Sequence, residues 1–307
     1  MSVLQNTEPK PFLKWVGGKT QILDYIRNQL GGDFDTYYEP FVGGGSVLLM
    51  IISMINTNQL KLKKIIVSDI NWQLICTYNS VKNNPKVLMA KIDEIYKNYK
   101  IAKVVEYEKR HKCILTTLKD AVEKGKKYVY YYFRKKYNEL KNPCIEVASY
   151  FIILNKLCFR GLYRAGKNGF NTAYGNYINP RVYDRNNIIK LNYLFNSHNI
   201  VFKHQSYETI KPTDKDLIYM DPPYYPIRKN AFESYSTRKF NHDNLVNFTL
   251  RCKNFVQSNA WCDFTIERYK QYPNKKILCK RRINSKKPED SDYEIMIFSK
   301  SLSSGIC

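Results

Sequence analysis

The chain lacks the features that mark metal-binding, membrane-spanning and secreted proteins. Its eight cysteines form no CxxC pair, and its four histidines do not complete a zinc pattern, so we expect no bound metal. Its longest apolar runs, such as residues 47–55, are too short to span a membrane. Its N-terminus has no apolar signal core, and scattered cysteines are typical of reduced thiols. We therefore expect a soluble, intracellular protein.

Acidic residues are also scarce. The sequence has 27 Asp and Glu against 50 Lys and Arg, which gives a formal net charge of +23. The excess is uneven, because residues 71–190 hold 24 basic and 9 acidic residues and so carry about two thirds of it. A compositional bias alone would spread the charge evenly along the chain. The uneven excess indicates an anionic partner, with nucleic acid as the first candidate.

A glycine cluster between a short strand and a helix is the first structural signal. Residues 37–50 read YYEPFVGGGSVLLM, and residues 64–69, KIIVSD, are predicted to be a buried strand that ends in an acid. Strand, glycine turn, helix, strand and acid, in this order, are typical of the opening of a doubly wound α/β domain. Asp69 stands where such folds place an acid that binds a ribose.

The middle of the chain has a different texture. Residues 72–158 are predicted to be mainly helical, and the Gly- and Asn-rich residues 160–179 to form an irregular loop or β-hairpin. Strand patterns then return at residues 199–203, 216–220, 254–257, 276–279 and 293–298. The simplest organisation is one α/β domain split into residues 1–70 and 192–307, with residues 71–191 inserted between its halves.

Neither glycine stretch is specific on its own. Residues 43–48, GGGSVL, lack the last glycine of the dinucleotide-binding fingerprint. Residues 17–20, GGKT, are no P-loop, because Leu13 stands where that motif needs its first glycine. A tight structural turn explains each stretch about as well as a ligand site does.

Asp221-Pro222-Pro223-Tyr224 is the strongest chemical signal. It follows a predicted strand directly, where ligands bind in open α/β sheets, and its two prolines fix the backbone. The Asp221 carboxylate beside the Pro222 carbonyl offers two acceptors, which suits an amino group with two hydrogens. Tyr224 offers a flat face on which a base can stack. The competing interpretation is a proline-rich turn that only closes the strand.

These groups suit methyl transfer to an exocyclic amine of a base. Its nitrogen is a poor nucleophile, since its lone pair is delocalised into the ring. Two acceptors on its hydrogens favour a pyramidal nitrogen whose lone pair points at a methyl donor, so positioning and electrostatics carry the transfer. The amine is inaccessible inside a duplex, so the base must be flipped out of the stack.

In these motifs the chain resembles the Dam-type DNA adenine-N6 methyltransferases, the class whose target-recognition domain lies between the cofactor motif and the DPPY motif. The likeness covers nearly the whole chain. The segments that carry it, in order, are residues 10–19 (KPFLKWVGGK), 39–46 (EPFVGGGS), 131–138 (YYFRKKYN), 154–175, 221–224 (DPPY), 232–235 (FESY) and 258–259 (SN). Several motifs in the right order are more specific than any one of them.

The resemblance implies a Rossmann-like α/β methyltransferase fold, S-adenosylmethionine as cofactor and double-stranded DNA as substrate. The implied catalytic residues are Asp221, Pro222, Pro223 and Tyr224. The implied cofactor contacts are Trp15, Gly17, Gly18, Lys19, Phe41, Gly43, Asp69 and Asp221. The implied DNA contacts are Phe159, Arg160, Leu162, Arg164 and Asn171. It further implies an inserted, mainly helical recognition domain over residues 71–191, and a restriction endonuclease that acts on the same site as a candidate partner.

Three of these DNA contacts have expected roles. Arg164 aligns with an arginine that reads a guanine edge, which suits the bidentate pairing of arginine with O6 and N7. An ordinary phosphate contact is the alternative. Leu162 is expected to touch a neighbouring base and Phe159 to wedge into the stack, or else to be buried under the loop. Outside the loop, Arg134 lies on a helix face that is expected to meet phosphates.

The sequence departs from the family pattern in its recognition segment. Arg160 stands where the family usually has asparagine, and Ala173 replaces a common proline. Both departures leave the predicted chemistry unchanged, but they leave the target sequence undetermined. The GATC site that family members often recognise is the working hypothesis.

Three other functions compete with this interpretation. Protein N5-glutamine methyltransferases share the catalytic turn but have asparagine in place of Asp221, and they lack a basic insert at this position. An RNA adenine methyltransferase would use the same chemistry, although the resemblance in the loop of residues 160–179, the recognition loop, favours DNA. A DNA-binding protein without activity would have lost catalytic residues, and this sequence retains those that the chemistry needs.

Overall fold

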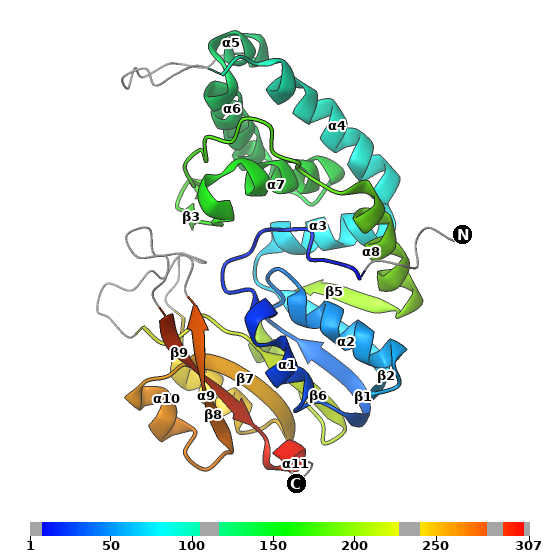
Figure 1. Cartoon of the computed structure of the whole chain (residues 1–307), viewed down its shortest axis with the longest axis vertical. Coiled ribbons are helices and arrows are strands. Elements are labelled where there is room, and N and C mark those ends of the chain that lie inside the picture. The colour runs from blue at the N-terminus through cyan, green and yellow to red at the C-terminus, as the bar shows by residue number, and fades with distance from the viewer. Residues whose placement is uncertain (1–7, 105–116, 227–239, 281–290, 304–307) are drawn as a thin grey trace. The chain divides into compact units, whose positions relative to one another are not determined.

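The computed structural model describes residues 8–104, 117–226, 240–280 and 291–303 (Figure 1). It divides into two compact units. The helical unit comprises residues 8–16, 72–104 and 117–193. The sheet unit comprises residues 17–71, 194–226, 240–280 and 291–303. Residues 232–235, which belong to the segments that carry the family resemblance, lie outside the described residues.

The sheet unit is built on a seven-stranded sheet of order β5-β2-β1-β6-β7-β9-β8. The first five strands in this order pair in parallel, and β9 pairs antiparallel with both β7 and β8. The strands are β1 (Gly32–Glu39), β2 (Leu60–Asp69), β5 (Ile200–His204), β6 (Asp216–Met220), β7 (Asn254–Ala260), β8 (Asn274–Lys280) and β9 (Ser291–Phe298). The predicted strands and the predicted Rossmann-like α/β class are confirmed.

One face of this sheet carries an apolar core. Ile218 and Met220 of β6 pack there with Phe255, Leu245 and other buried side chains, including those of α9 (His242–Thr249). Because side chains alternate along a strand, the neighbours of Ile218 on β6 point to the opposite face. The helices of the unit are η1 (Lys19–Gln21), α1 (Leu23–Arg27), α2 (Ser46–Asn56), η3 (Tyr207–Thr209), α9, α10 (Asp263–Arg268) and α11 (Lys300–Ser303).

The glycine cluster makes the turn between β1 and α2. Gly43 has a φ of +47° and Gly45, the N-cap of α2, has a φ of +74°. Residues with a Cβ rarely adopt such angles, so the two glycines allow the chain to turn sharply from strand into helix. Residues 47–52 of α2 are all buried, and Figure 1 shows this helix beside β2.

The helical unit holds α3 (Trp72–Asn83), α4 (Pro85–Ile101), α5 (Leu118–Lys124), α6 (Lys126–Glu139) and α7 (Ile145–Leu157), with η2 (Phe159–Gly161) after them. The predicted hairpin in residues 160–179 is confirmed as β3 (Ala165–Gly166) and β4 (Gly169–Phe170). The chain leaves this unit within α8 (Arg185–Ser197). Tyr130 of α6 is fully buried, and its hydroxyl donates to the carbonyl of Thr172 over 2.8 Å, so this aromatic side chain is part of the core of the unit.

The N-terminal segment packs with the helical unit through two asparagine side chains. The Asn155 amide accepts from the Lys14 backbone N–H at 2.8 Å and donates to the Lys14 carbonyl at 2.7 Å. Asn187 holds the backbone of Lys10 in the same way, at 3.0 and 2.9 Å. The residues up to Val16 therefore belong to the helical unit, whereas the sequence predicted one continuous segment 1–70. The assignment of that segment to a catalytic domain stays a prediction.

No helix among the described residues combines the length and the apolar character needed to cross a membrane. Within the same residues, no group of His, Cys, Asp and Glu side chains has the arrangement of a metal site.

Candidate active site and recognition loop

Four strands of the sheet unit end at the same edge of the sheet. The strands β1, β2, β6 and β7 run parallel, so their carboxyl ends lie together. β1 ends at Glu39, β2 ends at Asp69, and Asp221 follows the last residue of β6. Three carboxyl groups therefore meet the glycine turn at one edge.

Lys19 and Asp221 form a buried ion pair at this edge. The Lys19 Nζ lies 2.8 Å from Asp221 Oδ1, and the two side chains are 5% and 22% exposed. The same Nζ donates to the carbonyl of Gly17 over 2.7 Å, and the Lys19 backbone N–H donates to Ser46 Oγ over 3.2 Å. Gly17, with a φ of +82°, thus turns the chain so that Lys19 reaches Asp221, and Gly18 is the N-cap of η1.

Burial and charge act in opposite directions on this pair. Burial acts to lower the pKa of Lys19, but the carboxylates of Asp221 and Glu294 outweigh it, so the pKa of Lys19 lies above its ordinary value. Burial raises the pKa of Asp221 to about 6, although the Lys19 ammonium acts to lower it. We therefore expect Lys19 to stay charged, and Asp221 to be mostly a carboxylate at pH 7.

Tyr224 is held at its hydroxyl and over its ring. Its Oη donates to Glu294 Oε2 over 2.8 Å, and Lys19 Nζ lies 5.1 Å from the ring centroid. Burial and the nearby carboxylates raise the pKa of Tyr224 well above its ordinary value, so the hydroxyl remains a donor. Pro222 is buried and Pro223 is half-buried.

Glu39 is a buried acid that the sequence analysis did not single out. Its carboxyl accepts from the Tyr37 hydroxyl at 2.9 Å and is 2% exposed. Burial raises the pKa of Glu39 to about 8, and the Asp221 carboxylate adds to this rise. The acid therefore stays mostly protonated at pH 7. Its place in the EPF segment was the only sequence signal that could have identified it.

Asp69 is bound to the glycine turn. Its two carboxyl oxygens accept from the backbone N–H groups of Gly43, at 3.3 Å, and of Asn71, at 2.9 Å. Burial raises the pKa of Asp69 to about 6, against the effect of these hydrogen bonds. The ring of Phe41 packs against those of Tyr207 and Phe240, with centroids 5.4 and 6.0 Å apart, so this side chain also supports the core.

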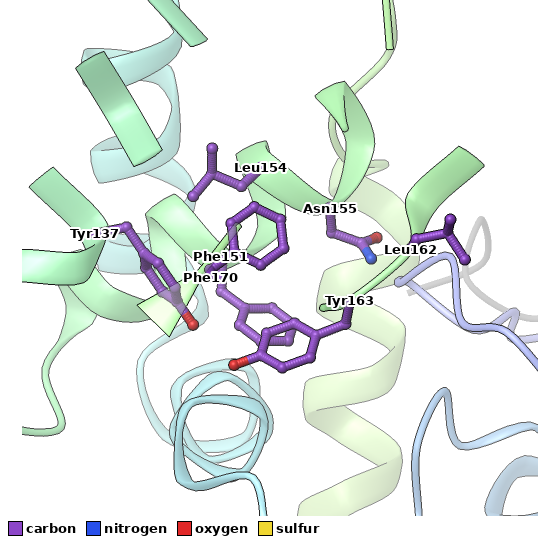
Figure 2. Close-up of a pocket in the computed structure, with 7 residues that line it drawn as sticks. All are labelled: Tyr137, Phe151, Leu154, Asn155, Leu162, Tyr163 and Phe170. Atoms are coloured by element: carbon purple, nitrogen blue, oxygen red, sulfur yellow. The ribbon is translucent and has the colours of Figure 1, made fainter. Parts of the chain in front are cut away.

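Trp15 lies in the helical unit, in a stack of aromatic rings. Its ring centroid is 5.9 Å from Tyr163 and 6.4 Å from Phe151, with interplanar angles of 21° and 18°. Figure 2 shows the rings of Phe151, Tyr163 and Phe170 together, lining a small hollow with Asn155. The stack joins the N-terminal segment to the recognition loop, and the cofactor contact of Trp15 stays a prediction.

Arg164 and Asn171 form one unit within the hairpin. The Arg164 Nε donates to Asn171 Oδ1 over 2.7 Å, and Nη2 lies 3.4 Å from the Asn171 carbonyl. Arg134 of α6 donates to the carbonyls of Asn171 and Thr172 at 3.2 and 3.0 Å. The structure thus brings three predicted DNA-contacting residues together, and Arg134 supports the loop backbone.

The start of the recognition loop exposes an aromatic ring. Phe159 is 44% exposed, which favours the wedge role over burial under the loop. Arg160, with a φ of +56°, places its guanidinium 5.3 Å from the Phe159 ring centroid. Leu162 lines the hollow of Figure 2. Gly161 turns the chain at a φ of +68°, where a Cβ would lie 2.5 Å from the Cβ of Lys14.

Comparison with known proteins shows the family of the chain. The family model of the D12 class N6 adenine-specific DNA methyltransferases matches residues 15–284. Type II methyltransferase M.MjaIII of Methanocaldococcus jannaschii is 34% identical over 311 residues, which cover 95% of this chain and 99% of that protein. Type II methyltransferase M1.LlaDCHI of Lactococcus lactis subsp. cremoris is 29% identical, over 80% of this chain and 78% of its own. The DNA adenine methylase of Escherichia coli K12 is 30% identical, over 75% of this chain and 71% of its own. The chain belongs to the D12 class of adenine-specific DNA methyltransferases.

Proposed function

We propose that the protein transfers a methyl group from S-adenosylmethionine to N6 of an adenine flipped out of duplex DNA, with GATC as the first target to test. The observation that carries the proposal is the Asp221 carboxylate, held by Lys19 at 2.8 Å where β6 ends. Membership of the D12 class supports adenine in DNA as the substrate. The cofactor, the flipped base, the roles of the residues and the target sequence are parts of the proposal.

The donors and acceptors of the sheet unit fit S-adenosylmethionine. Asp69, bound to the Gly43 turn, offers acceptor oxygens to the two hydroxyls of a ribose. Lys19 and Asp221 present opposite charges, which match the carboxylate and the ammonium of the amino-acid part. Ser68 Oγ, next to Asp69 on β2, is buried without a hydrogen-bond partner among the described residues and offers one more polar group.

S-adenosylmethionine supplies an electrophilic methyl group on a sulfonium sulfur. The Asp221 carboxylate and the Pro222 carbonyl accept the two N6 hydrogens, so that the nitrogen lone pair turns toward the methyl carbon. When bound, S-adenosylmethionine would supply the methyl carbon to which the nitrogen bonds, and its sulfur would take the electron pair of the broken carbon–sulfur bond as a neutral thioether. The nitrogen then carries one proton too many, and Asp221, whose pKa is about 6, can accept it.

DNA recognition is assigned to the hairpin of the helical unit. Asn171 accepts from Arg164 Nε through its side chain and from Nη2 through its carbonyl, which fixes the plane of the guanidinium. The remaining N–H groups of the two terminal nitrogens can then donate to a guanine edge. The exposed ring of Phe159 is suited to unstacking a base step. A restriction endonuclease that acts on the same site belongs to the proposal, because two of the relatives are named Type II methyltransferases.

The test is transfer of a labelled methyl group from S-adenosylmethionine to matched duplexes that contain GATC or scrambled sites. The digest should yield N6-methyladenine, and the Asp221→Ala variant should yield none while still binding DNA. N6-methyladenine in other sequences would replace GATC and retain the chemistry. Label in RNA alone, or in neither nucleic acid, would refute the proposal.

A further inference from the structure

Glu294 was not among the residues expected to act in the site, yet its carboxylate accepts the hydroxyl of Tyr224 at 2.8 Å. Glu294 lies on β9, half-buried, opposite Ala260 of β7 and Ile277 of β8. Two antiparallel neighbours hold the β9 backbone on both sides at this residue. The carboxylate therefore sits on a rigid part of the sheet and not on a loop.

Strand alternation places Glu294 on the side of the sheet that carries the site. Its neighbour Ile295 belongs to the apolar core on one face, so the Glu294 side chain points to the other face. Tyr219 and Ser258 share that other face, where their hydroxyls lie 3.1 Å apart. The face that carries Glu294 is therefore polar at the carboxyl end of β6, next to Asp221.

The catalytic turn is held at two successive residues by two strands. The backbone N–H of Tyr225 donates to Asn259 Oδ1 at the end of β7, over 3.0 Å. The side chain of Tyr224 donates to Glu294 of β9. The backbone of Tyr225 and the ring of Tyr224 are therefore held by different strands, so the plane of the ring does not depend on the backbone of the turn alone.

We propose that Glu294 is a positioning residue, which fixes the ring plane of Tyr224 on which the target adenine stacks. The inference rests on the proposed function. A tyrosine ring has two faces and one polar edge. The Lys19 ammonium takes one face, at 5.1 Å from the centroid, and Glu294 takes the edge. The remaining face is then held in one plane, and stacking needs such a fixed platform.

The test is a double-mutant cycle on methyl transfer to duplex DNA. Glu294→Ala should lower kcat about tenfold, as expected for loss of a hydrogen bond to a charged acceptor. Tyr224→Phe, which retains the ring and removes the hydroxyl, should cause a similar loss. The double variant should lose no more than either single variant, because both remove the same contact.

A second variant separates positioning from charge. Glu294→Gln retains an acceptor oxygen and removes the charge near Lys19 and Asp221, so it should stay within about threefold of the wild type. Glu267→Ala, on an exposed acid that pairs with Lys270 at 2.6 Å, is the matched control and should leave kcat unchanged. All variants should be folded at the assay temperature and should bind DNA with near wild-type affinity, which a general loss of the fold would not allow.

Multiplicative losses in the double variant would overturn the inference, as would a Glu294→Gln variant as slow as Glu294→Ala. A wild-type protein that transfers no methyl group to any DNA would refute the proposed function itself, and with it this role. The two failures are distinct, since the first appears only among variants of an active enzyme.

Discussion

Replacement of Lys19 by methionine should move the acid limb of the pH–rate profile. The proposed mechanism needs Asp221 as a carboxylate, so activity should fall as the pH drops through its pKa of about 6. Lys19, at 2.8 Å, lowers that pKa against burial. Without the ammonium, burial acts unopposed by the ion pair, and the pKa should rise by about one to three units.

The magnitude follows from the ionised fraction. With a pKa of about 6, roughly nine tenths of Asp221 is ionised at pH 7. A rise of about two units leaves roughly one tenth ionised, so kcat/KM for DNA at pH 7 should fall about tenfold and recover above pH 9. Lys19→Arg, which retains the charge, should shift the limb little.

The assay is methyl transfer at saturating cofactor between pH 5 and 10. Saturation separates Asp221 from Asp69, whose pKa is also about 6 but whose proposed role is cofactor binding. Lys63→Met, which removes an exposed partner of Asp35, is the matched control and should leave the profile unchanged. An acid limb that stays at the same pH in Lys19→Met would show that Asp221 does not set it.

Three further outcomes are expected. Asp221→Asn should abolish transfer while leaving nonspecific DNA binding largely intact, as measured by label incorporation and a gel-shift titration. Arg164→Ala should relax the preference for one base pair of the target, at a cost of about 1–3 kcal/mol, whereas an equal loss on all sequences would make it a phosphate contact. Asn155→Ala, which removes both hydrogen bonds to the Lys14 backbone, should lower the free energy of unfolding by about 1–3 kcal/mol in denaturant titrations, and an unchanged midpoint would contradict this.

Local patterns predicted much of the fold and of the site. The run of residues 216–220 into Asp221 identified both the strand β6 and the candidate site at its end, because the strand pattern and the motif follow each other directly in the sequence. The glycine turn was equally local, and Gly43 and Gly45 have the positive φ angles that such a cluster favours. Arg164 and Asn171, seven residues apart, were both expected in the recognition loop.

Contacts between distant segments could not be predicted in this way. Glu294 lies 70 residues from Tyr224, and no spacing rule links an acid on an antiparallel strand to that ring. The same holds for the N-terminal segment, where Asn155 binds Lys14 from 141 residues away. A pattern of single residues does not report such pairs, because sheet order and helix packing decide which side chains meet.

The Lys19–Asp221 ion pair and the hydrogen bond from Tyr224 to Glu294 show how residues outside the four-residue motif support the proposed site. In water the Asp221 carboxylate would be a weak hydrogen-bond acceptor for an amine, because solvent would compete for it. Burial strengthens the carboxylate as an acceptor but raises its pKa, and Lys19 limits that rise so that the charge survives at pH 7. Glu294 then raises the pKa of Lys19 while it holds Tyr224. Each of these groups would be costly to bury alone, and each is stabilised by its neighbours, so we expect their substitutions to act non-additively on kcat.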